Sequence, residues 1–292
     1  MMKQVFLVIL LAFGFVVGAQ NKIVKKPKKQ KPATTQVAPK KHKSQSKPTK
    51  GGTVKRVATK ASYSNGTLTV NGIKYNMVWV DGGTFRMGAT SEQGSEISDE
   101  KPVHSVTLSG YYIGKTEVTQ ALWKAVMGSN WSRFKGDDLP VEQVSWYDCQ
   151  EFIRKLNSLT GQNFRLPTEA EWEFACRGGN NSRGYKYSGS NYIDNVAWYD
   201  GNSGKKTHPV ATKSPNELGI YDMSGNVFEW CSDWKGDYSS GAQTNPKGPY
   251  DGSYRVHRGG GWHYDARSCR SSIRLNYYPT NRSFNLGLRL AL

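Results

Sequence analysis

Cysteine and histidine are two residue types in this chain whose side chains could act as nucleophiles, bases or metal ligands. No CxxC pair occurs, and the spacings match no zinc ligand set. No nucleophile-elbow motif occurs either, so a Ser/His/Asp triad has no support. We expect the thiols to be buried and free, or paired if the compartment is oxidising. The four cysteines are Cys149, Cys176, Cys231 and Cys269, and the five histidines are His42, His104, His208, His257 and His263.

The part of the chain after Gly178 contains both oxygen-bearing side chains and tryptophans. This part of the chain is rich in Gly, Asn, Tyr and Ser, and it carries few signals for helices or strands. Long loops need something besides regular structure to hold them, and bound cations and buried aromatic rings are the usual means. We therefore expect mostly loop here, held by cations and by Trp198, Trp230, Trp234 and Trp262.

The elements that position this region begin with strands. Residues 68–70 and 73–80 alternate around Asn71-Gly72, which is a strong two-residue hairpin signal. Residues 84–87 and 104–108 read as further strands by alternation.

Two helices follow the strands. Ser145 is expected to cap a helix over residues 146–156. A second helix is expected over residues 169–174, where Thr168 and Glu171 have the spacing of a capping box.

The N-terminal residues differ from the rest in composition. Residues 1–19 have the pattern of a secretory signal peptide, with an apolar run too short to span a bilayer and a cleavage site after Ala19. Residues 20–64 are expected to be a basic disordered linker. Residues 20–60 hold 14 Lys and Arg and no Asp or Glu, and Lys3 adds one, so the remainder carries only +2 of the net +17. The folded part therefore shows no charge signal for nucleic-acid binding.

Six segments, in the same order, resemble the formylglycine-generating enzyme family, also called the sulfatase-modifying factor family. Together they span about 215 residues, which makes the resemblance specific. The segments are MVWVDGGTFRMG (77–88), KTEVT (115–119), LPV with VSW (139–146), RLPTEAEWE (165–173), GIYDMSGNVFEW (219–230), and RGG with NLGLR (258–289).

The resemblance implies an α+β fold of the C-type-lectin-like, sulfatase-modifying-factor type. Such a fold is loop-rich, has little regular secondary structure and is stabilised by calcium. The family-like domain is expected over residues 65–292, as one unit.

The resemblance also implies two structural calcium sites, since Ca²⁺ takes oxygen ligands from carboxylates, amides and carbonyls. In the first site, the side chains of two acids and the carbonyls of two loop residues would surround the ion. The alternative is that these acids only cap and pair within a loop. The expected ligands are Asp222, Gly225, Val227 and Glu229 at the first site, and Asn195, Val196, Asn202 and Gly204 at a weaker second site.

Active members of the family use two cysteines, five positions apart, to bind copper and to oxidise a substrate cysteine. Here the resemblance aligns Cys269 with the second thiol and Tyr264 with the first. Gly261 stands where the family has Ser, and Phe228 stands where it has Trp. One thiolate cannot form a two-coordinate sulfur site for Cu(I). His263 lies beside the missing position but is expected to point elsewhere, so copper is not expected.

Two functions remain open. One is a secreted, non-catalytic homologue that binds a protein or glycan through residues 264–284, a stretch rich in Tyr, Asn, Arg and Ser. This stretch also resembles the ligand face of variable C-type-lectin-type proteins. The other is a formylglycine-generating oxidase acting on sulfatase cysteines. We expect a secreted, periplasmic or envelope location, with the basic tail contacting an anionic surface, no specific nucleic acid and no transmembrane segment in the mature chain.

Overall fold

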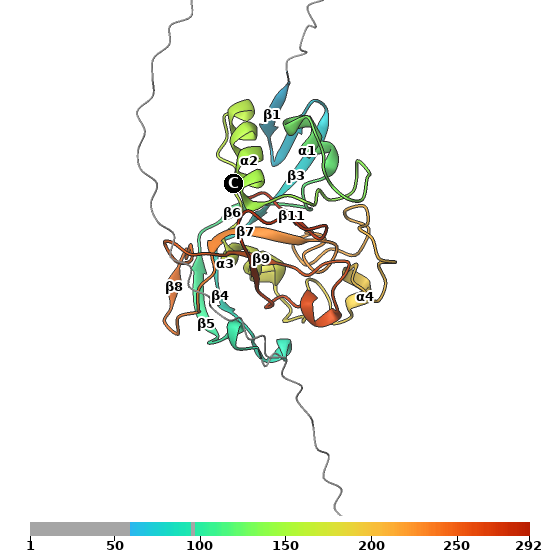
Figure 1. Cartoon of the computed structure of the whole chain (residues 1–292). Helices are drawn as coiled ribbons and strands as arrows, with labels where there is room; N and C mark the ends of the chain where they lie inside the picture. The colour runs from blue at the N-terminus through green and yellow to red at the C-terminus, as the bar shows by residue number, and fades with distance from the viewer. Residues whose placement is uncertain (1–58, 95–96) are drawn as a thin grey trace, which may run out of the picture. The chain divides into compact units, whose positions relative to one another are not determined.

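The computed structural model describes residues 59–94 and 97–292 (Figure 1). The expected signal peptide and residues 20–58 of the expected linker lie outside the described residues. The fold starts earlier than the expected boundary at residue 65, because Ala61–Ser64 form strand β1, which pairs with β2 (Thr67–Val70). Tyr63 anchors β1, since its ring meets Phe164 edge-on at 5.5 Å.

The first sheet has the strand order β1-β2-β3-β6, with β3 at Ile73–Val80 and β6 at Tyr111–Gly114. The expected hairpin is confirmed: β2 and β3 are antiparallel, and Asn71 and Gly72 both have positive φ, as a two-residue turn requires.

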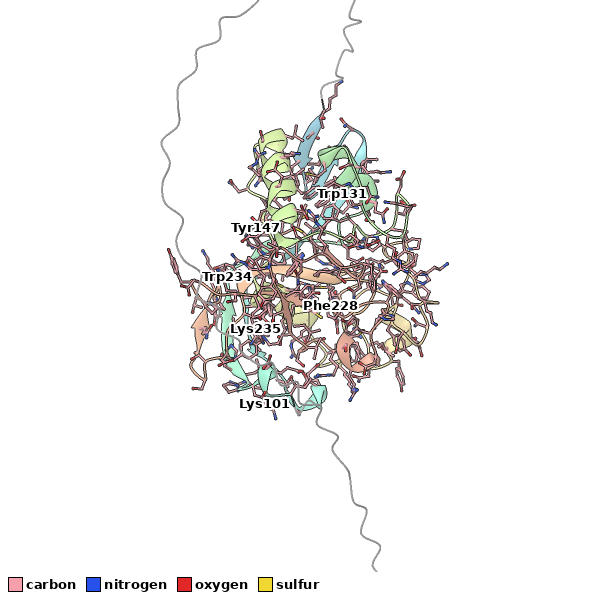
Figure 2. All side chains as sticks on the ribbon, in the orientation of Figure 1. Lys101, Trp131, Tyr147, Phe228, Trp234 and Lys235 are labelled. Atoms are coloured by element: carbon pink, nitrogen blue, oxygen red, sulfur yellow. The ribbon has the colours of Figure 1, made fainter. Side chains whose placement is uncertain are left out.

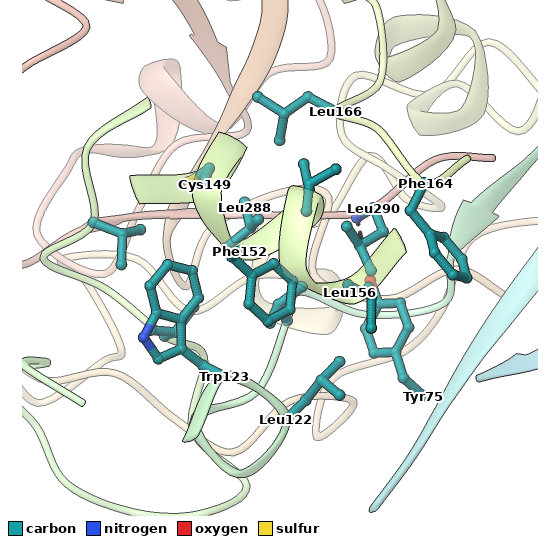
Figure 3. Packing of buried hydrophobic residues seen from close by; sticks show 14 of the residues in the cluster. Tyr75, Leu122, Trp123, Cys149, Phe152, Leu156, Phe164, Leu166, Leu288 and Leu290 are labelled. Atoms are coloured by element: carbon teal, nitrogen blue, oxygen red, sulfur yellow. Dashed lines mark hydrogen bonds between the residues drawn. The ribbon is translucent and has the colours of Figure 1, made fainter. Parts of the chain in front are cut away.

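Two helices cover this sheet and form the larger core. They are α1 (Gln120–Met127) and α2 (Trp146–Thr160), and α2 begins with the capping box of Ser145 and Asp148. Figure 3 shows how Trp123 stacks on Phe152, with ring centroids 4.8 Å apart. Leu288 and Leu290, near the C-terminus, lie in the same cluster.

All four strands of the second sheet come from the region after Gly178. Its order is β10-β9-β7-β11, where β7 is Phe228–Trp234, β9 is Arg255–Arg258, β10 is Leu275–Tyr277 and β11 is Leu286–Leu288. Strand β11 is parallel to β7, while β9 is antiparallel to it. Helix α3 (Glu169–Cys176) packs against β7 and β9, and it begins with the expected box of Thr168 and Glu171.

A third sheet of order β4-β5-β8 lies at one side of α3 in Figure 1. It comprises β4 (Gly83–Met87), β5 (His104–Leu108) and β8 (Gln243–Thr244). The remaining elements are short: α4 (Ile193–Val196) and 3-10 turns at Ser91–Gln93, Ser98–Glu100, Gly179–Asn181 and Ala266–Cys269.

The architecture confirms the expected loop-rich α+β class. The expectation of mostly loop after Gly178 missed the second sheet. Strand β7 is buried along nearly its whole length, so its sequence FEWCSDW has no polar alternation that would identify it. No helix within residues 59–94 and 97–292 combines the length and apolar composition needed to cross a bilayer.

Candidate functional site

A fully buried ion pair joins two of the segments that carry the family resemblance. Glu229 on β7 accepts hydrogen bonds from Arg289, at 2.6 Å to Oε1 and 2.9 Å to Oε2. Trp172 on α3 donates its Nε1–H to Glu229 Oε2 at 2.7 Å. Arg289 also donates to the carbonyl oxygens of Gly114 and Tyr221, at 2.8 Å each. This arginine therefore links the first sheet, through Gly114 of β6, to the second sheet, through Glu229 of β7.

Two further carboxylates lie close to this pair. Glu117 is fully buried and accepts from the amides of Asn226 and Val227, both at 3.2 Å. Burial, and then the negative charges of Asp222 and Glu229, raise the pKa of Glu117 well above its ordinary value. Burial also raises the pKa of Asp222 to about 6. Among the described residues, Arg289 is the cation whose charge opposes these shifts, so three carboxyl groups share one guanidinium.

The loop between Asp222 and Glu229 contains the four residues expected at the first calcium site. Among the described residues, nothing donates a hydrogen bond to the carbonyl oxygens of Gly225 or Val227, so both have free lone pairs. Gly225 has a φ of 85°, and a Cβ there would lie 2.4 Å from the carbonyl oxygen of Trp198, so the loop shape requires glycine. A cation would offset the buried charge of Asp222, which fits Ca²⁺ chemistry.

Glu229 fits the expected ligand role less well than Asp222. Both of its oxygens already accept hydrogen bonds, and Arg289 neutralises its charge. Within the described part of the chain, no three His, Cys, Asp or Glu side chains form a group that could hold a metal. A cation here would therefore depend on backbone carbonyls as much as on acids. Glu117 was missed, although it lies within the KTEVT segment that carries the resemblance.

The second expected calcium site is organised by Asn202. Its Nδ2 donates to Asp194 Oδ1 at 3.1 Å and to the carbonyl of Ala197 at 3.0 Å, and its Oδ1 accepts from the amide of Tyr199 at 3.0 Å. These bonds close the turn after α4. They also satisfy the side-chain amide of Asn202, which is held in place without a cation. The carbonyl of Asn195 accepts from Ser214 at 2.9 Å. The other two expected ligands are Val196, at the end of α4, and Gly204, at a φ of 59°.

Cys269 is buried and free, as are the other three cysteines. Burial raises the pKa of its thiol to about 12, so the thiolate is scarce at neutral pH. A Cβ on Gly260 would lie 2.6 Å from its sulfur, which leaves no room on that side. Tyr264 is 38% exposed and meets Phe228 edge-on at 5.0 Å. The ring of His263 lies 4.9 Å from that of Trp262.

Four exposed tyrosines form a surface that we call the tyrosine surface: Tyr254, Tyr264, Tyr277 and Tyr278. Tyr254 and Tyr278 contact each other, with centroids 4.5 Å apart and hydroxyls 3.0 Å apart. A chain of ring contacts through buried Phe228 and His257 connects Tyr264 to Tyr277. The expected binding stretch 264–284 thus supplies three of the four members.

Buried ion pairs are a feature that the sequence analysis missed entirely. Arg258 pairs with Glu173, and both are fully buried. Arg274 pairs with Glu169 at 2.5 Å. Partners in these pairs lie 85 and 105 residues apart, so no local pattern indicates them.

Known proteins share this fold and sequence pattern. A family model described as "Sulfatase-modifying factor enzyme 1-like domain" matches residues 67–292. A "Chaperone protein LppX" of Paenibacillus barcinonensis is 38% identical, over 79% of this chain and 92% of that protein. A "Formylglycine-generating enzyme" of Streptomyces coelicolor is 30% identical, over 73% of this chain and 88% of that protein.

A solved structure agrees with these relatives. "Treponema denticola variable protein 1" is similar with a TM-score of 0.70 and 37% identity, covering 77% of this chain and 97% of that one. The fold, the ordered motifs and these matches agree over the same residues, and the chain belongs to the sulfatase-modifying factor, or formylglycine-generating enzyme, family.

Proposed function

We propose that this chain is a secreted or envelope-associated, non-catalytic member of its family, and that it binds a partner through the tyrosine surface. The observation that carries the proposal is the state of the one thiol that aligns with the family's copper site. Cys269 is buried, and its pKa of about 12 keeps it protonated. The resemblance aligns Tyr264 with the other copper-ligand position, and a phenol is a hard oxygen donor unsuited to Cu(I).

The tyrosine surface supports binding as the alternative to catalysis. Exposed tyrosines supply rigid contact area at low conformational-entropy cost, and neighbouring Asn and Ser add adaptable hydrogen bonds. The relative from Paenibacillus is named a chaperone protein, and the similar Treponema structure is named a variable protein. Neither name describes an oxidase.

Structural calcium at Asp222, Gly225, Val227 and Glu229 is part of the same proposal. The ion would offset the buried negative charge and fix the loop that leads into β7. The proposed second site, at Asn195, Val196, Asn202 and Gly204, is weaker because it has no carboxylate among those four. The basic tail would hold the protein near an anionic envelope surface, with affinity that falls as salt rises.

The test is incubation with copper, a reductant, O₂ and a sulfatase-motif cysteine peptide, followed by mass spectrometry. We expect no formylglycine and no tight Cu(I) binding. Turnover that disappears in Cys269→Ser would overturn the proposal in favour of the oxidase. The matched gain-of-site variant is Tyr264→Cys with Gly261→Ser, for which we expect a rise in Cu(I) affinity if the loop retains the family geometry.

A further inference from the structure

Two pockets adjoin each other on the part of the domain that carries β8. Their volumes are about 350 Å³ and about 610 Å³, and both are lined by Pro246 and Lys247, which follow β8. We call the pair the bridged groove. None of the four tyrosines of the tyrosine surface lines it. Its size is that of sites for small ligands or short oligomers.

The lining of the groove includes two bidentate salt bridges, one in each pocket. In the smaller pocket, Arg274 donates to both oxygens of Glu169, at 2.7 and 2.5 Å. In the larger pocket, Arg165 donates to both oxygens of Glu171, at 2.6 and 2.7 Å. Paired in this way, the four side chains are planar, rigid and neutral overall. Arg274 and Glu169 are buried and bonded within the protein, whereas Arg165 is 41% exposed and has N–H donors left for a ligand.

The other charged groups of the groove balance as well. Lys247 and Asp237 contribute one charge of each sign. Asp233 is buried and accepts from the Glu169 amide at 3.0 Å and from the Ser232 hydroxyl at 2.8 Å. Burial raises the pKa of Asp233 to about 7, so near neutral pH this carboxyl can donate or accept a hydrogen bond. The lining therefore offers many hydrogen bonds and little net charge.

Each pocket also contains an indole that is held rigidly. Trp234 lines the smaller pocket and Trp146 lines the larger one. Arg255 lies between them, with its guanidinium carbon 3.4 Å from the Trp234 ring centroid and 3.9 Å from that of Trp146. Trp146 Nε1 donates to the carbonyl of Cys231 at 2.9 Å. The reader can locate the bridged groove in Figure 2 by the labels of Trp234 and Lys235 and by Tyr147, which lies at the start of α2.

We propose that the bridged groove binds an uncharged oligosaccharide. Sugar rings present apolar C–H faces, which suit fixed indoles, and rows of hydroxyls, which suit locked carboxylate–guanidinium pairs. Balanced lining charge gives no net attraction to an acidic polymer or a basic peptide. Two adjoining pockets, each with its own indole, match a ligand that repeats along its length.

The test measures binding of neutral tetrasaccharides to the purified chain by calorimetry and tryptophan fluorescence. Maltotetraose, cellotetraose, chitotetraose and mannotetraose are the probes, with tetragalacturonate and a basic octapeptide as charged comparisons. We expect saturable binding of at least one neutral probe. We expect Gln150→Ala, which changes a half-buried lining residue on α2, to weaken it about tenfold, or about 1.4 kcal/mol. Trp146→Ala, checked by thermal melting, should weaken it further.

Gln162→Ala is the matched control, because Gln162 lies just past α2 and lines neither pocket. Binding should be unchanged in this variant. Failure of every neutral probe, preference for a charged probe, or equal binding by the Gln150 and Gln162 variants would each overturn the proposal. Neither Tyr264 nor Cys269 lines the groove. The result of this sugar-binding test is therefore independent of the result of the copper test.

Discussion

The Arg289–Glu229 pair should be among the most important interactions for stability in the domain. Arg289→Met removes a buried cation while keeping an apolar chain of similar length. The change leaves Glu229 charged and buried, with only Trp172 as a donor, and removes the donors to the carbonyls of Gly114 and Tyr221. Breaking such a pair from one side costs about 3–5 kcal/mol, and each orphaned carbonyl adds about 1 kcal/mol.

We therefore expect Arg289→Met to lower the free energy of unfolding by about 5 kcal/mol. For a domain of this size, that corresponds to a fall in melting temperature of roughly 10–20 °C. Urea unfolding followed by tryptophan fluorescence measures the change, with equal m-values as the check that both variants unfold alike.

The matched experiment is a double-mutant cycle with Glu229→Gln, which keeps an acceptor for Trp172. Because the double variant contains neither member of the ion pair, its loss should be smaller than the sum of the single losses by at least about 2 kcal/mol. Additive losses, or a loss below about 1 kcal/mol for Arg289→Met, would refute the view that this pair holds the first and second sheets together. A loss for Glu229→Gln that disappears in chelator would instead assign the carboxylate to calcium.

Three further predictions concern calcium, pH and backbone shape. Chelation should lower the melting temperature, and Asp222→Ala should abolish this sensitivity; an unchanged response would show that the site is misplaced. Asp233 has a folded pKa of about 7 against an ordinary 3.8, so the folded state holds more protons between these values. Its contribution to the free energy of unfolding therefore falls, by up to about 4 kcal/mol, as the pH rises from about 4 to 8. In the Asp233→Asn variant, the urea concentration at the midpoint of unfolding should depend less on pH. Gly260→Ala should lower the free energy of unfolding by at least about 2 kcal/mol, because φ is 80° and the new Cβ would lie 2.6 Å from the sulfur of Cys269. Gly204→Ala is the control: its φ is 59° but no atom lies near the new Cβ, so chemical denaturation should show a loss of about 1 kcal/mol.

Several local features could be predicted from the sequence because their partners lie within a few residues. The turn at Asn71-Gly72 needs positive φ at both positions, and these two residue types tolerate it. The box of Thr168 and Glu171 closes over three residues, and the structure contains both of its hydrogen bonds. The order of the family-like segments then indicated the fold class, although periodicity alone would not have named it.

The hairpin, the two capped helices and the family were therefore predictable from the sequence. The tertiary structure alone decided the second sheet and the charge pairing, since β7 pairs with residues 29 and 58 positions away along the chain, as Glu229 opposite Arg258 and Phe228 opposite Leu286 show. It also decided that Cys269 is buried, that Glu117 joins Asp222, and that one arginine serves the whole cluster. The physical reason is that burial and charge compensation depend on which distant segments meet, and a linear pattern records neither.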